Sequence, residues 1–456
     1  MIQADDDKYY LPVYYHSEEG TARLIEAITR MPSPYGETDS EMIMRRLPSH
    51  IQYNDMQQQA VIAAVTSKCM VLTGGPGTGK TTTTMAILKV FQSLGAKIQL
   101  CAPTGRAAKR LSETTRREAK TIHRMLEYKP GEGFKKNEKH PLNCDVLIVD
   151  EASMLDVVLM YQLMKAIKQQ TVLILVGDVD QLPSVGPGNV LKDLIGSGCV
   201  TVIRLSEIFR QAQHSLIVTN AHRINQGEFP ILNVTKRRDF FFIESDDPES
   251  IPGKIVQLCK KRLPMYFKVD PIQDIQVLCP MQRGSTGTHQ LNRLLQHALN
   301  PQTKFITVKQ TTYYLYDKVM QIRNNYDKNV YNGDIGRIVG VDDVNRIVYI
   351  RFDNATVEYQ VSELDEIVLA YAMTVHKSQG SEYPIVIAPL TTQHFMMLQR
   401  NLLYTSMTRA QKAYVLIGSK RAIAMAVKND KVMVRNTRLK ERLQHYREKE
   451  IPEFNL

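Results

Sequence analysis

The sequence predicts an α/β protein with two parallel-sheet lobes and a small antiparallel barrel inserted into the second lobe. Three observations predict this fold class: short apolar runs alternate with helical patterns early in the chain, a second such series follows later, and the second series is interrupted by short strands without helices. Strands that alternate with helices form parallel sheets covered on both faces. A chain of 456 residues also has room for about three domains.

The first lobe is expected over residues 51–205. Met85, Ile87, Leu88 and Phe91 recur at helical spacing after the first apolar run. A polar insert at residues 128–143 is rich in glycine and lysine and is expected to form an exposed hairpin or loop. The candidate strands of this lobe are Met70–Thr73, Ile98–Ala102, Val146–Val149 and Thr171–Val176.

The second lobe is expected over residues 206–303 and 368–438, and the barrel over residues 304–367. The strands of the second lobe are expected at Ile275–Cys279, Pro384–Ala388 and Tyr414–Ile417. Those of the barrel are expected at Val319–Ile322, Gly336–Val341, Ile347–Phe352 and Thr356–Val361, with a hairpin-type turn at Asn332-Gly333.

Two flanking segments complete the expected organisation. Residues 1–50 form an N-terminal segment before the first lobe. Residues 439–456 form a highly charged tail, for which a solvated helix is the default expectation.

The composition excludes several classes of protein. No apolar run approaches the roughly 20 residues of a membrane-spanning helix, and the acidic start of the chain lacks the pattern of a signal peptide. We therefore expect a soluble, cytoplasmic protein. The 6 cysteines form no CxxC pair, so a zinc site is not expected, and Cys101 and Cys279 are expected to be buried. The net charge of +11 suits a phosphate-bearing partner, although many soluble proteins are mildly basic.

A phosphate-binding loop is predicted between the first strand and the helix that follows it. The segment Gly74-Gly75-Pro76-Gly77-Thr78-Gly79-Lys80-Thr81 matches the pattern GxxxxGK[ST]. Glycines let the backbone curl so that its amides face phosphate oxygens, and the helix amino terminus adds positive potential. Lys80 is expected to reach the β- and γ-phosphates of ATP, and the Thr81 hydroxyl is expected to bind Mg²⁺.

Two further polar segments follow strands of the same lobe. Asp150 and Glu151 come directly after Val146–Val149, at the strand end where open α/β sheets bind ligands. Asp150 is expected to hold Mg²⁺ through water, and Glu151 to orient and polarise the attacking water. Gln181 follows the next strand and is placed to sense the γ-phosphate, although in isolation an ordinary polar turn would be the favoured interpretation.

Taken together, the motifs resemble the RecD-like branch of superfamily 1 helicases, from about residue 50 to residue 420. No single motif is specific to this branch, but their combination and order are. Besides the segments above, the resemblance rests on residues 102–108 (APTGRAA), 121–124 (TIHR), 150–154 (DEASM), 208–211 (IFRQ), 372–382 (AMTVHKSQGSE) and 404–410 (YTSMTRA).

The resemblance implies an ATP-dependent DNA helicase. It implies two RecA-like lobes with ATP between them, an SH3-like barrel in the second lobe, and 5′→3′ movement on single-stranded DNA, including DNA junctions with a 5′ tail. The polarity comes from the resemblance alone.

Carried over position by position, the resemblance assigns roles to residues outside the phosphate loop. Gln57 matches the adenine-reading glutamine, although Gln58 and Gln59 are adjacent to it. Arg210 and Arg409 match two arginines of the second lobe that reach the γ-phosphate; the alternative for each is a surface salt bridge. Gly380 and Glu382 belong to a motif that contributes to the nucleotide site. Thr104, His123 and His376 match positions that contact the DNA strand, and such contacts to phosphate carry no sequence information.

The chain departs from the family in one respect. Stand-alone relatives carry a long N-terminal region before the motor, whereas about fifty residues precede the first motif here, so the chain is either a fragment or a short member. Two other functions stay open from the sequence: a helicase acting on RNA, and a non-catalytic protein whose binding of nucleic acid is gated by nucleotide.

Overall fold

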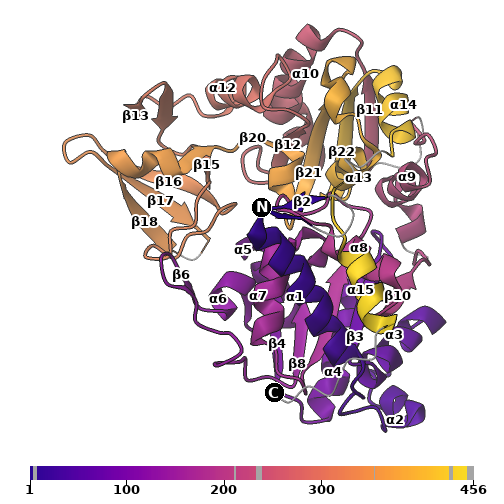
Figure 1. Cartoon of the computed structure of the whole chain (residues 1–456). Coiled ribbons are helices and arrows are strands. Elements are labelled where there is room, and N and C mark those ends of the chain that lie inside the picture. Colours follow the sequence, from indigo (N-terminus) through magenta and orange to yellow (C-terminus); the bar gives the residue numbers. More distant parts are fainter. Residues whose placement is uncertain (4–7, 210–211, 233–238, 354, 431–434, 449–456) are drawn as a thin grey trace. The chain divides into compact units, whose positions relative to one another are not determined.

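The computed structural model describes residues 1–3, 8–209, 212–232, 239–353, 355–430 and 435–448. The chain divides into two compact units (Figure 1). The first unit comprises Met1–Phe209 and Met433–Leu456, and the second comprises Arg210–Val432.

The first unit is built on a six-stranded sheet in which every neighbouring pair of strands is parallel. The four predicted strands all lie in this sheet. The strand order is β10 (Thr201–Leu205), β3 (Cys69–Gly74), β9 (Val172–Gly177), β8 (Val146–Val149), β4 (Ile98–Ala102) and β5 (Ala119–Thr121).

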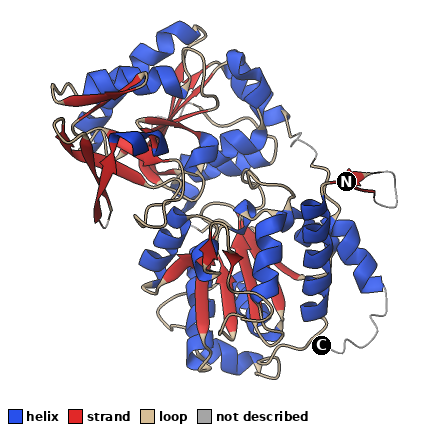
Figure 2. Cartoon of the chain, turned by 60° about the vertical axis from the view of Figure 1, so that its left-hand side comes forward, coloured by secondary structure: helices blue, strands red, loops and turns tan. Residues whose placement is uncertain are grey.

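Helices cover both faces of this sheet, because successive strand residues point to opposite sides (Figure 2). On one face, strand residues such as Val71 and Leu147 pack with α1 (Pro12–Thr29), α7 (Val157–Ala166) and α8 (Val190–Ser197). On the other face, Leu72 and Ile148 pack with α2 (Ser40–Arg45), α3 (Asp55–Thr66), α4 (Lys80–Ser93) and α5 (Gly105–Thr115).

Short elements complete the first unit. Strands β1 (Ile2–Gln3) and β2 (Tyr9–Tyr10) pair antiparallel near the amino terminus. Helix α6 (Ile122–Met125) leads into the predicted insert, where β6 (Tyr128–Lys129) and β7 (Gly133–Phe134) form a small antiparallel hairpin.

The charged tail is not a solvated helix over its described part, so that expectation is wrong there. Helix α15 (Leu439–Glu448) packs against α1 and α8, and its Leu439 and Leu443 side chains are completely buried. Its charges find partners on α1, because the Arg442 guanidinium forms ion pairs with both Glu18 and Glu19.

The second unit contains a five-stranded parallel sheet. Its order is β11 (Phe240–Glu244), β22 (Ala410–Gly418), β21 (Tyr383–Leu390), β12 (Ile275–Cys279) and β20 (Ala372–Thr374). The three predicted strands correspond to β12, β21 and β22. The α-helices of this unit are α9 (Leu216–Asn225), α10 (Ile251–Gln257), α11 (Leu263–Phe267), α12 (Thr288–Leu299), α13 (Arg400–Met407) and α14 (Lys420–Lys428).

Between β12 and β20 the chain forms the predicted antiparallel insert, which has its own apolar core. The hairpin β13 (Phe305–Val308) and β14 (Thr311–Tyr314) joins this core through Ile306 and Tyr313. The main sheet has the order β18 (Ala355–Gln360), β17 (Ile347–Phe352), β16 (Ile335–Asp342), β15 (Lys318–Gln321) and β19 (Ile367–Leu369). The two parallel sheets and this insert confirm the predicted fold class.

One detail of the insert differs from the expectation. Asn332-Gly333 lies in a turn closed by the Asp334 amide on the Tyr331 carbonyl oxygen (2.9 Å), but only Gly333 has a positive φ, of 98°. A two-residue type I′ hairpin needs positive φ at both central residues. The turn therefore lies within the longer connection from β15 to β16.

Two findings bear on the classes considered from composition. Within the described part of the chain, no helix combines the length and the apolar character that crossing a membrane requires. All six cysteines are free thiols in buried positions, and burial raises the pKa of Cys69 to about 12.

Candidate functional site

The carboxyl edge of the first sheet collects the predicted polar segments. Four neighbouring strands each end in one of them: β3 leads into the phosphate loop, β9 into Gln181, β8 into Asp150 and Glu151, and β4 into Thr104. Because the strands are parallel, these segments emerge at the same edge, where open α/β sheets bind ligands.

The phosphate loop has the backbone conformation that its glycines permit. Gly77 and Gly79 adopt φ values of 73° and 87°, in the left-handed region that side chains disfavour. The Lys80 ammonium donates to the carbonyl oxygens of Gly74 (2.5 Å) and Gly75 (3.0 Å), so its charge lies over the loop. Thr81 is exposed in the first turn of α4. The loop thus combines a helix amino terminus, a cation and an accessible hydroxyl.

Gln57 is completely buried beside this loop, and only half of its amide is satisfied. Its Oε1 accepts from the Asn54 amide (3.1 Å) in the capping box that starts α3. Its Nε2 has no hydrogen-bond partner among the described residues, and a Cβ built on Gly79 would lie 2.4 Å from it. An unpaired buried donor costs about 1–3 kcal/mol. A ligand with a hydrogen-bond acceptor, such as a purine ring nitrogen, would satisfy it.

Phe209 also contacts the phosphate loop, although the sequence assigned no role to this residue. Its amide donates to the Gly77 carbonyl oxygen (3.1 Å), and its ring lies 2.3 Å from a Cβ built on Gly79. Only glycine fits at position 79 for this reason. Arg210 follows directly and lies outside the described residues, so the structure places no side chain for it.

Asp150 and Glu151 form a closely coupled acid pair after β8. The Asp150 amide donates to the Cys101 carbonyl oxygen (2.9 Å), which fixes the strand end against β4. Burial, and then the Glu151 carboxylate, raise the pKa of Asp150, while Arg110 and Lys80 oppose this shift. A hard divalent cation prefers carboxylate and hydroxyl oxygens and would offset the same repulsion. The pair therefore fits a Mg²⁺ site.

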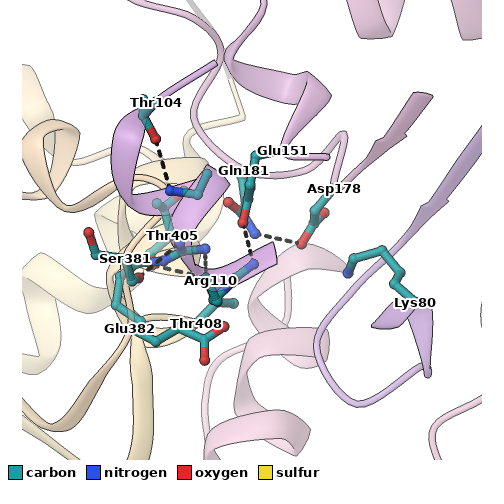
Figure 3. Close-up of polar contacts among 12 residues, drawn as sticks. Lys80, Thr104, Arg110, Glu151, Asp178, Gln181, Ser381, Glu382, Thr405 and Thr408 are labelled. Atoms are coloured by element: carbon teal, nitrogen blue, oxygen red, sulfur yellow. Dashed lines mark hydrogen bonds and ion pairs between the residues drawn. The ribbon is translucent and has the colours of Figure 1, made fainter. Parts of the chain in front are cut away.

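Glu151 is a buried residue, and its side chain points to a partner that the sequence did not single out (Figure 3). Arg110 on α5 donates from Nη2 to Glu151 Oε1 at 2.8 Å. Glu151 itself has a positive φ of 52°, which is uncommon for a residue with a side chain.

Gln181 is held by a buried carboxylate from its own turn. Its Nε2 donates to Asp178 Oδ2 (3.2 Å), and Asp178 is 1% exposed. The turn is fixed to the phosphate-loop strand, because the Val179 amide donates to Thr73 Oγ1 (3.3 Å). Gln181 thus lies in a turn that is hydrogen-bonded to the phosphate-loop strand.

The candidate DNA contacts of the first unit lie at the same edge. Thr104 caps α5, its Oγ1 accepting from the Ala107 amide (3.3 Å). His123 follows β5 and packs against Tyr128 (5.6 Å) and Phe134 (5.7 Å) of the hairpin insert. Burial lowers the pKa of His123, so its imidazole is neutral near pH 7. Both side chains can offer neutral donors to phosphate oxygens.

The second unit separates its predicted residues between two edges of its sheet. His376 lies in the short helix Val375–Ser378 after the carboxyl end of β20, and burial lowers its pKa. Gly380 and Glu382 precede the amino end of β21, and Arg409 precedes that of β22. The structure therefore brings Gly380, Glu382 and Arg409 to one edge and His376 to the other.

Arg409 is 2% exposed, so the alternative of a surface salt bridge is wrong for this residue. Its guanidinium donates to the carbonyl oxygens of Ser381 (3.1 Å) and Thr405 (3.3 Å) and to the Thr408 hydroxyl (3.3 Å). Among the described residues, no carboxylate pairs with it. A buried cation held only by neutral oxygens is suited to an anionic ligand.

Models of three domain families match the chain. An AAA domain matches residues 57–187, the SH3 domain of ATP-dependent RecD-like DNA helicases matches residues 291–352, and a UvrD-like helicase C-terminal domain matches residues 369–417.

Curated relatives match along almost the whole chain. The ATP-dependent RecD2 DNA helicase of Deinococcus radiodurans is 36% identical over 96% of this chain, which spans 59% of that relative's length. The RecBCD enzyme subunit RecD of Mycobacterium tuberculosis H37Rv is 31% identical over 96% of this chain and 80% of its own length. A solved structure of Pif1 helicases at forked double-stranded DNA aligns with a TM-score of 0.49 and 16% identity, covering 80% of this chain and 92% of that one.

Proposed function

Because the chain belongs to the RecD-like family of ATP-dependent DNA helicases, we propose that it hydrolyses ATP to move along single-stranded DNA and separate duplex strands. The observation that carries the proposal is the convergence of the phosphate loop, the acid pair and Gln181 on one edge of the first sheet.

In this proposal the loop Gly75–Gly79 and Lys80 hold the phosphates, and Gln57 Nε2 donates to the adenine. Thr81 and Asp150 hold Mg²⁺. Bound ATP with Mg²⁺ supplies the phosphoryl group whose transfer to water drives the motor. Glu151 orients and polarises that water, and Gln181 senses the γ-phosphate. The resemblance assigns Arg409 and Arg210 to the same phosphate, and Gly380 and Glu382 to the nucleotide site.

The strand contacts are proposed for Thr104, His123 and His376. None of them offers a side chain that reads base edges by paired hydrogen bonds, so the protein should contact the phosphates and the faces of the bases. A motor that tracks a strand must accept every base. We propose single-stranded DNA, and junctions with a 5′ tail, as the substrate.

Steady-state ATP hydrolysis with and without single-stranded DNA tests the catalytic proposal. We expect slow turnover alone and strong stimulation by DNA. Lys80→Ala should abolish turnover, since the phosphate charge loses its fixed cation. Glu151→Gln should bind ATP with nearly normal affinity but hydrolyse it very slowly. Turnover of Glu151→Gln at the wild-type rate would refute the role of Glu151 in activating water.

Matched oligonucleotides test the substrate and the polarity. Stimulation of hydrolysis by RNA instead of DNA would support the alternative of an RNA helicase. Binding of strands without any turnover would support a nucleotide-gated binding protein. For polarity, strand displacement should occur on a duplex with a 5′ tail and not on the same duplex with a 3′ tail.

A further inference from the structure

The contact between Arg110 and Glu151 has a bearing on the regulation of hydrolysis. Glu151 is the residue proposed to activate water, yet its Oε1 lies 2.8 Å from the Arg110 guanidinium (Figure 3). A carboxylate engaged in a charge-assisted hydrogen bond is a weaker acceptor for a proton of water. The Glu151 side chain is 7% exposed, so its charge needs a charged or hydrogen-bonding partner.

The Arg110 side chain is better able to move than Glu151. The Arg110 side chain is 32% exposed, so its guanidinium can leave the contact for water without being buried unpaired. Glu151, in contrast, is fixed at the end of β8, since the preceding Asp150 amide is bonded to β4. A small shift of the Arg110 side chain, or of α5, would therefore release Glu151.

Helix α5 also carries a candidate strand contact. Thr104 is its amino cap, and the helix amino terminus there favours a phosphate anion. Strands β4 and β8 are hydrogen-bonded neighbours, with Cys101 opposite Val149. Thr104 and Glu151 thus follow adjacent strands, each within a few residues of this pair. Helix α5 connects Thr104, its amino cap, with Arg110.

We propose that Arg110 is a positioning residue that holds Glu151 in an idle orientation, and that a nucleic-acid phosphate engaging the amino end of α5 releases it. This inference rests on the function proposed above and explains how strand binding stimulates hydrolysis. Without a strand, Arg110 restrains Glu151 and turnover is slow. With a strand, α5 moves, Glu151 is freed to face water and turnover rises.

The test compares Arg110→Gln and Arg110→Lys with the wild type, each with and without saturating single-stranded DNA. Gln removes the charge that restrains Glu151, so we expect faster turnover without DNA and a nearly unchanged rate with DNA. Coupling between two sites is typically about 5- to 150-fold, so the stimulation factor should fall by at least about fivefold. Arg110→Lys retains a charge but not the planar fork, so its stimulation factor should lie between those of the wild type and of Arg110→Gln.

The stimulation factor is a ratio measured on one preparation, so a partly unfolded variant does not change it. Lys109→Gln is a matched control, because it removes a charge from the same helix, and Lys109 forms an ion pair with Glu113. It should leave the factor at the wild-type value.

Two results would overturn the inference. An Arg110→Gln protein with wild-type turnover in the absence of DNA would show that the contact does not restrain Glu151. Equal losses of the rates with and without DNA would show that Arg110 assists catalysis. If the wild type itself showed no stimulated turnover, the proposed function would fail, and the two failures are thereby distinguishable.

Discussion

Arg409 shows how a single buried residue changes an interpretation made from the sequence. From the sequence, an arginine before a strand could equally be a surface salt bridge. The structure buries its guanidinium among neutral oxygens of residues 381, 405 and 408. A buried guanidinium with such contacts also stabilises the fold, so stability and turnover must be measured together.

If Arg409 has the role that the resemblance assigns to it, Arg409→Ala should bind ATP nearly normally yet hydrolyse it about 10³-fold more slowly or worse, even with saturating DNA. Arg409→Lys should rescue little, because a point charge cannot replace a planar fork. Turnover, a nucleotide-binding titration and thermal unfolding on the same variants check this. A lower melting temperature with wild-type turnover of the folded fraction would reveal a purely structural residue.

Gln57 offers a second test at this scale, since one of its amide atoms serves the helix and the other has no partner. Gln57→Ala should weaken ATP binding by about tenfold, as expected for one lost hydrogen bond of about 1.5 kcal/mol. It should also reduce the preference for ATP over pyrimidine triphosphates. Asn54→Ala is the control, because it breaks the same capping box but leaves the Gln57 amide in place. A wild-type preference for ATP in Gln57→Ala would remove Gln57 from the base site.

The residues that could be predicted from the sequence are those that belong to a contiguous motif. The phosphate loop, Asp150 and Glu151 follow strands directly, so their placement needs only local pattern and the rule for sheet edges. Arg110 could not be predicted in this way, because its partner lies 41 residues further along the chain. Only the pairing of β4 with β8 brings α5 to the acid pair.

At the scale of elements, the main strands of the two parallel sheets were predicted, whereas the packing of the terminal helix against the first unit was not. Buried parallel strands are short apolar runs that are visible in the sequence. Helix α15 is rich in charge, and its two buried leucines give a weak apolar face. Its stability depends on α1 and α8, which lie hundreds of residues away. Glu18 and Asp193 are buried beside the segment that leads into α15. Because burial raises the pKa of both carboxyl groups, the packing of α15 depends on pH.

We expect this docking to weaken as pH rises. Burial raises the pKa of Asp193 to about 6, with Glu18 and Glu441 adding to the shift and with Lys192 and the Thr437 hydroxyl, 2.9 Å away, opposing it. A carboxyl whose pKa is raised by folding contributes stability at low pH that is lost as pH rises through the folded value. Asp193→Asn should therefore raise the melting temperature at pH 7 to 8 and have little effect near pH 4. An equal effect of Asp193→Asn at both pH values would contradict this account.

At the scale of the whole molecule, charge and fold bear on different questions. The two parallel-sheet units could be predicted from apolar periodicity, whereas the net charge of +11 says nothing about fold. Charge matters once the substrate is a polyanion. In combination with the proposed strand contacts, none of which reads bases, the positive charge predicts binding driven by the release of counterions.

We therefore expect the affinity for single-stranded DNA to fall steeply with salt and to vary little with sequence. Each neutralised phosphate adds about −0.7 to the slope of log affinity against log salt, so a grip on about six phosphates gives a slope near −4. Stacking adds about 1–3 kcal/mol per base but accepts all four bases. Titrations of fluorescent oligonucleotides of equal length and unrelated sequence, at several salt concentrations, measure both quantities. Parallel lines of the same slope would support a strand-tracking motor. Affinities that differ by several powers of ten between sequences at one salt concentration would instead require base-specific contacts. An affinity that does not change with salt would show that the basic residues do not contact the strand.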